Sequence, residues 1–224
     1  MERHFDEELN RLKEKLLRMA SLVEEAISRA MKALVDRNPD LAAEVIKHDE
    51  EVNMLEIEID ELCLKLLALM QPIAVDLRFI TSAMKIGNDL ERMGDQAVNI
   101  AERTLELLKQ PQLKPLIDIP RMSTLAQKMV KDSLDAFVNK DAHLARDVCA
   151  RDDQVDNIND QVFRELLTYM MEDASTITRA VDLILIGRHL ERIADHATNI
   201  GEDVVYIVEG KTIKHHIEEK ISGG

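Results

Sequence analysis

The sequence IGNDLERMGDQAVNIAE occupies residues 86–102, and IGRHLERIADHATNIGE occupies residues 186–202. The two stretches are identical at ten of seventeen positions and begin one hundred residues apart. Internal repetition is the signature of repeated structural units, and it decides the architecture before local propensity does. The repeat therefore predicts two equivalent halves. It also duplicates a set of acidic side chains that packing alone does not require.

The composition of the whole chain favours helices and disfavours anionic partners. Its 224 residues are 46% hydrophobic, with seven Gly, five Pro and no Trp, which is typical of helical proteins. The net charge of −14 argues against binding to nucleic acid or to an anionic membrane, because both attract basic surfaces. No apolar stretch is long enough to span a bilayer, and the opening MERHFDEELN does not resemble a signal peptide. Cys63 and Cys149 lack a CxxC spacing, which favours a reduced, cytoplasmic environment.

Apolar periodicity and helix-breaking residues divide the chain into six helices. Asn38-Pro39 and Gln71-Pro72 separate the first three, and prolines at 111, 115 and 120 separate the two halves. Ser175 is expected to cap the sixth helix and Gly210 to end it. The expected helices span residues 5–37, 39–70, 72–109, 121–140, 141–172 and 175–209.

These helices predict an all-α fold of two tandem antiparallel three-helix bundles related by the internal repeat. The first bundle is expected at residues 1–110, a Pro-rich connector at 111–120, the second bundle at 121–210 and a flexible tail at 211–224. Asp49 and Val52 match Asp152 and Val155 at an offset of 103. A difference of three residues is therefore expected between the second and third helices of each half.

On a helical wheel, the repeated segment has three distinct faces. Glu91, Asp95, Asn99 and Glu102 share one face, as do Glu191, Asp195, Asn199 and Glu202. An apolar stripe lies opposite, and small residues border the two faces every seven positions: Gly87, Gly94 and Ala101, then Gly187, Ala194 and Gly201. Small residues let a neighbouring helix approach closely. The carboxylates are therefore expected beside a helix–helix seam, where an unneutralised like-charge pair is unfavourable.

The preceding helix of each half carries a matching acidic face. Its residues are Asp49, Asn53, Glu56 and Asp60 in the first half, and Asp152, Asp156 and Asn159 in the second. Oxygen ligands from two helices suit hard cations such as Mg²⁺, Mn²⁺ or Ca²⁺, or iron in a carboxylate cluster. The residues alone leave two interpretations open: a metal site, or an acidic surface for solubility or partner binding.

Several other residues are weaker candidates. Arg92 and Arg192 are expected to form ion pairs with the acids rather than to act in catalysis. His189 and His196 have Asp89 and Gln96 at the same places in the first repeat, so they are expected to be exposed and not to be ligands. His215-His216 lies in the tail, where it binds metal only adventitiously.

LERMGDQAVNIAE and LERIADHATNIGE resemble the duplicated signature of the PhoU family of phosphate-uptake regulators. QPIAVDLRFITSAMKIGNDLERMGD and NIGEDVVYIVEGK are also similar to this family, and the resemblance covers residues 5–212. It implies multinuclear metal sites built from E/DxxxD pairs, with iron, manganese, magnesium, zinc or nickel as the ion. The implied ligands are Asp49, Asn53, Glu91 and Asp95 in the first half, and Asp152, Asp156, Glu191 and Asp195 in the second.

The resemblance leaves open whether Asn99, Glu102, Asn199 and Glu202 are ligands or surround them. Asn53 departs from the acidic pattern, and a neutral amide is a weaker ligand than a carboxylate. The first site is therefore expected to bind metal less tightly than the second.

The resemblance also implies a function. PhoU-like proteins are negative regulators of the phosphate-starvation response that link a phosphate ABC transporter, through its ATPase, to a sensor histidine kinase in the bacterial cytoplasm. The expected protein is not an enzyme, does not insert into the membrane, does not bind nucleic acid, and can form a homodimer. One alternative is a carboxylate-bridged oxidase or ferroxidase, but none of the seven histidines follows a Glu at the Glu-x-x-His spacing of that class. The other alternative is a purely structural acidic scaffold.

Overall fold

Long apolar stripes at helical spacing fold this chain into helices, with no strand in the described residues 2–213 of the computed structural model. Side chains are described from Phe5 onward. The elements are α1 (Glu2–Asp36), α2 (Pro39–Met70), α3 (Ala74–Leu108), α4 (Asp118–Asn139), α5 (Ala142–Ala150), α6 (Asp152–Glu172), a 3₁₀ turn η1 (Ala174–Thr176) and α7 (Ile177–Glu209). The predicted all-α fold with two three-helix bundles is confirmed, with α5 and α6 together forming the middle helix of the second bundle.

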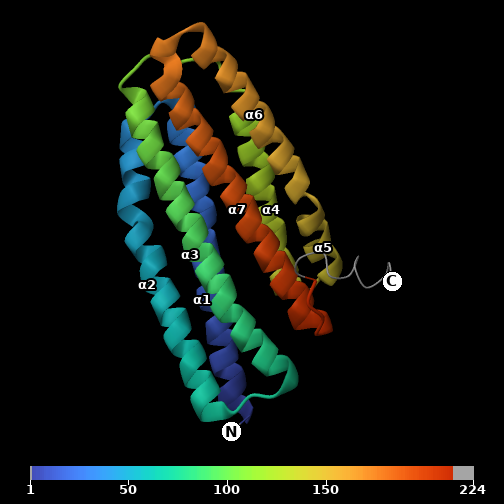
Figure 1. The fold of residues 1–224 in the computed structure, drawn as a ribbon. Helices are drawn as coiled ribbons and strands as arrows, with labels where there is room; N and C mark the ends of the chain where they lie inside the picture. The colour runs from blue at the N-terminus through green and yellow to red at the C-terminus, as the bar shows by residue number, and fades with distance from the viewer. Residues whose placement is uncertain (1, 214–224) are drawn as a thin grey trace, which may run out of the picture.

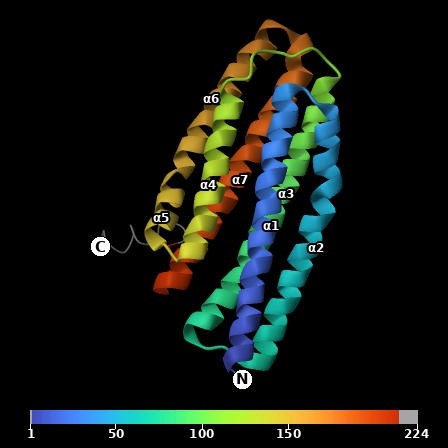
Figure 2. The ribbon, with the colours of Figure 1, turned by 180° about the vertical axis from the view of Figure 1, so that it is seen from behind.

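The two bundles pack side by side through α3 and α7. These helices run antiparallel along the middle of the molecule and share the most extensive contact of any two elements (Figure 1). Helices α2 and α6 lie at the two outer edges, and α1 and α4 lie behind the central pair, as the reverse view shows (Figure 2). The predicted acidic faces therefore belong to the layer formed by α2, α3, α7 and α6.

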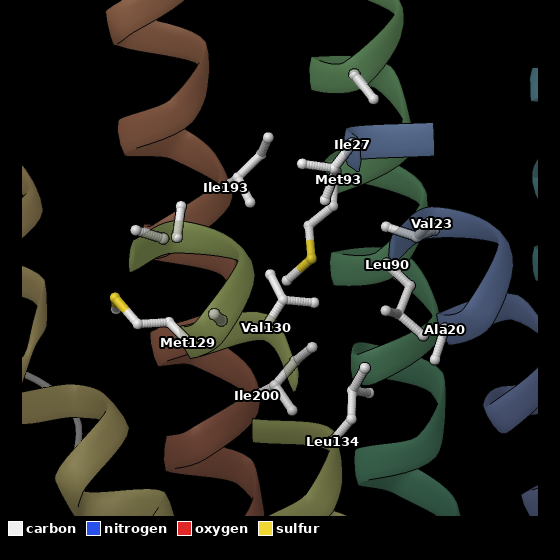
Figure 3. Close-up of a cluster of buried hydrophobic side chains, with 14 of the residues drawn as sticks. Ala20, Val23, Ile27, Leu90, Met93, Met129, Val130, Leu134, Ile193 and Ile200 are labelled. Carbon is white, nitrogen blue, oxygen red and sulfur yellow. The ribbon is translucent and has the colours of Figure 1, made fainter. Parts of the chain in front are cut away.

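A single hydrophobic core runs through both bundles. Figure 3 shows its central part, where side chains of α1, α3, α4 and α7 meet. The labelled residues are Ala20, Val23, Ile27, Leu90, Met93, Met129, Val130, Leu134, Ile193 and Ile200, all buried. Since apolar burial is the main stabilising term in folding, the bundles are held together by the same core that holds each of them.

The helix boundaries differ from those expected by a few residues: α1 begins at Glu2 instead of residue 5, and α3 begins at Ala74 instead of residue 72. Three other differences have a local reason. Helix α4 begins at Asp118 instead of residue 121, because Pro120 lies in its first turn, where a missing N–H is tolerated. The expected fifth helix divides at Arg151, whose N–H bonds to the carbonyl three residues earlier at 3.1 Å, as in a 3₁₀ turn. Ser175 is not the cap of the last helix: Asp173 accepts its N–H at 2.9 Å and caps η1 instead.

Other boundary predictions are confirmed. The side chain of Asn38 accepts the N–H of Leu41 at 3.1 Å and caps α2, and Gly210 ends α7 in the left-handed conformation with φ of +70°. The expected three-residue difference falls between the last two helices of each half. Residues 71–73, which connect α2 to α3, have no counterpart in the second half, because residue 70 matches Asp173 at the offset of 103 and residue 74 matches Ala174 at the offset of 100.

The C-terminal predictions lie mostly beyond the described part of the chain. Residues 214–224, including His215 and His216, are outside it. Among the helices between residues 2 and 213, none has the length and apolarity needed to cross a membrane.

Candidate metal centres

The first set of predicted ligands lies between α2 and α3. On α2, Asn53 donates from Nδ2 to Asp49 Oδ2 at 2.9 Å. Gly94 of α3 has no side chain, and a Cβ at that position would lie 3.5 Å from Asp49 Oδ1, so the carboxylate rests against the backbone of α3. Burial raises the pKa values of Asp49 and Glu91, and the carboxylate of Asp95 raises both further. The structure therefore brings these predicted residues together; we name them the first cluster.

Glu56 on α2 also belongs to the first cluster. The sequence placed it on the acidic face but not among the ligands. Its Oε1 accepts a hydrogen bond from Asn88 Nδ2 at 3.4 Å, and its charge contributes to the raised pKa of Glu91. The carboxylates of Glu56 and Asp49 therefore both raise the pKa of Glu91 on α3.

The carboxylate of Glu56 takes the place of one that the first half lacks at Asn53. At the offset of 103, Glu56 corresponds to Asn159, and Asn53 corresponds to Asp156. The halves exchange an amide and a carboxylate between these two positions of the helix. With Glu56 counted, the first cluster has as many carboxylates as were predicted for the second, and this exchange was the signal in the sequence that pointed to Glu56.

The second cluster lies between α6 and α7, where Asp152 and Asp156 face Glu191 and Asp195. Burial, followed by the carboxylates of Asp195 and Asp156, raises the pKa of Asp152 from 3.8 to about 6. Burial also raises the pKa values of Asp156 and Glu191. Asn159 of α6 donates to Glu191 Oε2 at 2.7 Å and connects the two helices. The predicted residues of the second half are therefore also brought together.

Arginines lie at the rims of the clusters. Arg92 lies 3.5 Å from Asp95 Oδ2, as the sequence predicted. Its counterpart Arg192 lines a polar cleft between α3 and α7, and Arg188 of the second cluster lies 3.4 Å from Glu191 Oε2. All three arginines are exposed, so water screens their charges, and they neutralise the carboxylates only weakly. Asp156 and Asp195 are themselves exposed, whereas the other carboxylates of the clusters are partly buried.

The donor atoms of the clusters fit a hard cation. Asn53 Oδ1, Glu91 Oε2 and Asp152 Oδ1 are buried and accept no hydrogen bond of good geometry among the described residues, although Arg92 Nε lies 3.5 Å from Glu91 Oε2 and the side chain of Thr198 interacts with Asp152. A buried acceptor without a partner costs about 1–3 kcal/mol, so a donor or cation is favoured at each of them. Carboxylate and amide oxygens are the ligands that hard divalent cations prefer, and carboxylates also bind iron.

The side chains of each cluster are not gathered around one point. Within residues 2–213, no three His, Cys, Asp or Glu side chains are close enough together to hold a metal ion. Repulsion between carboxylates favours such separation. The chemistry of the donors therefore fits a metal ion, and convergence on it requires side-chain rotation.

The four remaining candidates lie at different places. Asn99 and Asn199 both line the cleft between the bundles. Glu102 is exposed on α3, whereas Glu202 is partly buried, and its charge contributes to the raised pKa of Cys149. Of these four, the two asparagines face the seam between α3 and α7.

The seam between α3 and α7 is polar where the repeated segments cross. His189 Nδ1 lies 2.8 Å from Gln96 Oε1, and His196 Nδ1 lies 2.8 Å from Asp89 Oδ1. Both histidines are partly buried, so the expectation that they are exposed is wrong. Burial lowers the pKa of His189 to about 4, which keeps its ring neutral at pH 7.

These histidine contacts are crossed between the copies. In the repeat, Asp89 is the equivalent of His189, and Gln96 is the equivalent of His196. His189 therefore contacts the equivalent of His196, and His196 contacts the equivalent of His189. Antiparallel helices related by a twofold rotation produce such pairing, because the rotation reverses the order of contacts. The two halves are thus related by an approximate twofold axis across the seam.

Two ion pairs extend the crossed pattern along the seam. Arg103 lies 3.4 Å from Asp182, and Lys85 lies 3.4 Å from Asp203. Arg103 and Asp203 hold the same position in the two copies. Both aspartates are buried, so these interactions fix the register of α3 against α7 at two widely separated points.

A cleft of about 690 Å³ opens on the seam. Its lining consists of Arg92, Asp95, Gln96 and Asn99 from α3, Arg192, Asp195, His196, Thr198 and Asn199 from α7, and Asp152 from α6. Four positions of the repeat therefore contribute in both copies. Asp95 and Asp195 border a cluster on one side and the cleft on the other, so the two clusters are connected through this polar cleft.

The PhoU domain matches this chain twice, at residues 16–104 and 119–204. The chain belongs to the PhoU family. A phosphate-specific transport system accessory protein PhoU homolog from Aquifex aeolicus is 48% identical to it, over 95% of this chain and 97% of that protein. The PhoU homolog of the same description from Pseudomonas aeruginosa is 42% identical, over 94% of this chain and 88% of that protein.

Two crystal structures of PhoU proteins are similar in fold. PhoU from Pseudomonas aeruginosa has a TM-score of 0.90 and 42% identity, with 92% of this chain and 100% of that chain covered. The phosphate transport system regulatory protein PhoU from Streptococcus pneumoniae has a TM-score of 0.88 and 35% identity, with 94% and 99% covered. The predicted family and fold are therefore confirmed.

Each PhoU match contains one carboxylate cluster and one helix of the central seam. The first match includes Asp49 and Asp95, and the second includes Asp152 and Asp195. One PhoU repeat is thus the unit that supplies one cluster, and the pair of repeats supplies the cleft between them.

Proposed function

We propose that this chain is a metal-binding accessory protein that negatively regulates phosphate uptake and the phosphate-starvation response. The observation that carries the proposal is the match to PhoU homologs named as accessory proteins of the phosphate-specific transport system, over nearly the full length of both chains. The role is regulatory rather than enzymatic, in agreement with the regulatory description of the Streptococcus pneumoniae protein.

The metal ions of this proposal lie in the two clusters. Asp49, Asn53, Glu91 and Asp95 hold the first, with Glu56 beside them, and Asp152, Asp156, Glu191 and Asp195 hold the second. Raised carboxyl pKa values and buried oxygens without a hydrogen bond of good geometry support this assignment. A bound cation supplies positive charge that offsets the repulsion between carboxylates on two helices. The protein's own part is to hold α2 against α3 and α6 against α7.

The regulatory part of the proposal places the protein in the cytoplasm, between the ATPase of a phosphate ABC transporter and a sensor histidine kinase. A net charge of −14 suits protein partners better than nucleic acid or anionic lipid. The acidic surface and the family support this role together, and partner binding tests it directly.

A bacterium that lacks its own PhoU protein provides the first test. Expression of this chain should restore repression of a starvation reporter and normal phosphate uptake. Glu191→Ala/Asp195→Ala should lose both effects and part of the bound metal, measured by mass spectrometry on protein purified without a His tag. Asp135→Ala/Glu172→Ala removes two exposed acids elsewhere and serves as the matched control.

The outcomes separate the two parts of the proposal. A reporter that stays derepressed while the chain is present at normal levels refutes the regulatory role. Unchanged metal content in Glu191→Ala/Asp195→Ala refutes the second metal site. Binding of the purified chain to the transporter ATPase and to the kinase, with and without phosphate, then shows which partner it engages.

A further inference from the structure

The outward face of α2 carries an apolar stripe that no other helix within residues 2–213 covers. Helix α2 packs against α1 and α3 and lies at the edge of the molecule in both views (Figures 1 and 2). Met54, Ile57 and Leu64 project from it with exposed fractions of 52%, 50% and 58%. Their spacing of three and seven residues places them on one side of the helix, away from the core. A half-exposed stripe of large apolar side chains on a single helix is a candidate interaction surface.

The internal repeat supplies a control for this stripe. At the offset of 103, α6 has Asn157 and Asp160 where α2 has Met54 and Ile57, and both helices have leucine at the third position. Helix α6 holds the same place at the opposite edge of the fold (Figure 1). The fold therefore accepts polar side chains at these positions, and the packing of the bundle does not explain their apolar character in α2.

Acids outnumber basic residues around the stripe. Between residues 48 and 64 there is no Lys or Arg, and there are seven acids: Asp49, Glu50, Glu51, Glu56, Glu58, Asp60 and Glu61. Lys47 and Lys65 border this stretch, and Lys65 lies 3.6 Å from Glu8 of α1. The ion pairs of this stretch, Glu51 with Arg18 and Glu58 with Lys15, turn toward α1. Glu50 and Glu61 are exposed and lie on the same side of the helix as the stripe. The surface therefore combines apolar contacts with flanking carboxylates.

We propose that the outward face of α2 docks an amphipathic basic helix of a protein in the phosphate transport system. Such a helix buries apolar side chains on the stripe and places Lys or Arg beside the carboxylates, which gives complementary charge and register. A second copy of the same face brings like charges together, and an anionic lipid surface is repelled. This inference rests on the proposed function, because it locates the surface through which that function acts.

The test gives α2 the residues that α6 already has. Met54→Asn/Ile57→Asp changes two half-exposed side chains, so helix content and melting temperature should stay close to those of wild type. Val35→Asn/Val138→Asp is the matched control, because these valines are 50% and 52% exposed on other helices. The probes are the detergent-solubilised phosphate transporter and the sensor kinase of the host bacterium, each titrated against the immobilised full chain.

Wild type and the control variant should bind one of these probes, and Met54→Asn/Ile57→Asp should bind it at least tenfold more weakly. Binding should also weaken as salt rises, because the complementary charges are screened. If wild type and Met54→Asn/Ile57→Asp bind equally, the docking face is wrong and the proposed function stands. If wild type binds neither probe, the proposed function fails, and the docking inference fails with it.

A photo-crosslinking amino acid at position 64 identifies the occupant. Crosslinks to a basic segment of the bound transport protein support the inference. Crosslinks only between two copies of this chain overturn it in favour of a self-interface. Binding to vesicles of phosphatidylcholine and phosphatidylglycerol, if Met54→Asn/Ile57→Asp abolishes it, overturns it in favour of a lipid surface.

Discussion

Asp152→Asn is expected to stabilise the metal-free protein at neutral pH and to remove its stabilisation by added Mn²⁺. Burial and the carboxylates of Asp195 and Asp156 disfavour the charge of Asp152 and raise its pKa from 3.8 to about 6. At pH 7 the group is ionised, so the folded state bears an electrostatic cost that the unfolded chain does not. An asparagine removes that cost but is a neutral, poorer metal ligand.

The magnitude follows from the difference in pKa. One pKa unit corresponds to about 1.4 kcal/mol, so the difference between 3.8 and about 6 sets a ceiling of roughly 3 kcal/mol. Asp152 is only partly buried, and water screens its neighbours, which reduces the expected gain to about 1–2 kcal/mol. For a chain of this size, 1 kcal/mol changes the melting temperature by about 2–4 °C, so the variant should melt about 2–8 °C higher.

The gain depends on pH with a definite sign. Because the folded pKa of Asp152 lies above the unfolded one, the folded state binds this proton more tightly. Wild type therefore loses stability as pH rises from about 4 to about 6, and Asp152→Asn does not undergo that loss. The melting temperatures should nearly coincide at pH 4 and separate above pH 6.

Calorimetry in EDTA across this pH range, followed by calorimetry with millimolar MnCl₂ at pH 7, measures both effects. Glu172→Gln, an exposed change at the end of α6, is the control and should follow wild type in every condition. If Asp152→Asn melts at a lower temperature than wild type in EDTA at pH 7, the ionised Asp152 does not destabilise the metal-free protein. The metal assignment is refuted if Mn²⁺ stabilises the variant as strongly as wild type.

Three further predictions concern other parts of the molecule. Gly201→Ala should destabilise the protein by about 1–2 kcal/mol, because the added Cβ would lie 2.9 Å from a backbone carbonyl of α5. Gly87→Ala should stabilise it by up to about 1 kcal/mol, because its Cβ would meet only a side chain of α2 at 3.4 Å. Equal effects of the two changes in urea denaturation would contradict this. Arg103→Ala should cost about 1–3 kcal/mol in the same assay, since it leaves the buried Asp182 without its ion pair. Burial and nearby acids raise the pKa of Cys149 from 9.0 to about 11, so its native thiol should react with a disulfide reagent at pH 8 about a hundredfold more slowly than an ordinary thiol; a rate equal to that of the unfolded chain would show the opposite.

Much of the fold could be predicted because the decisive signals are local. Asn38 before a proline specifies a helix start, Gly210 specifies an end, and the repeated segment specifies which helices are equivalent. The small residues that border the carboxylate face also have the predicted purpose, since a Cβ at Gly94 would contact α2 at 3.4 Å. Such signals depend on neighbours a few residues away, and a helical wheel represents them correctly.

The seam between the bundles could not be predicted in the same way. A wheel tells which residues share a face but not which helix that face meets. Comparing His189 with Asp89, and His196 with Gln96, suggested that these positions were free to vary and therefore exposed. Because the helices cross antiparallel, His189 pairs with Gln96 and His196 pairs with Asp89, so the residues that differ between the copies form hydrogen bonds with each other. Recognising this requires the twofold relation, which a tandem repeat in the sequence does not reveal.

The same comparison changes the argument about the unequal metal sites. Asn53 alone suggested that the first cluster lacks a charge, but Glu56 on the same helix restores it. The difference lies in where the amide donates: Asn53 donates to Asp49 and favours its ionised form, whereas Asn159 donates to Glu191 of α7. The hydrogen bond of Thr198 to Asp152 is outweighed by burial and by the neighbouring carboxylates. Asp152 therefore keeps a pKa of about 6, and a cation gains more by neutralising it than by neutralising Asp49. The second cluster is still expected to bind metal more tightly, because its carboxylates have the larger repulsion for a cation to relieve.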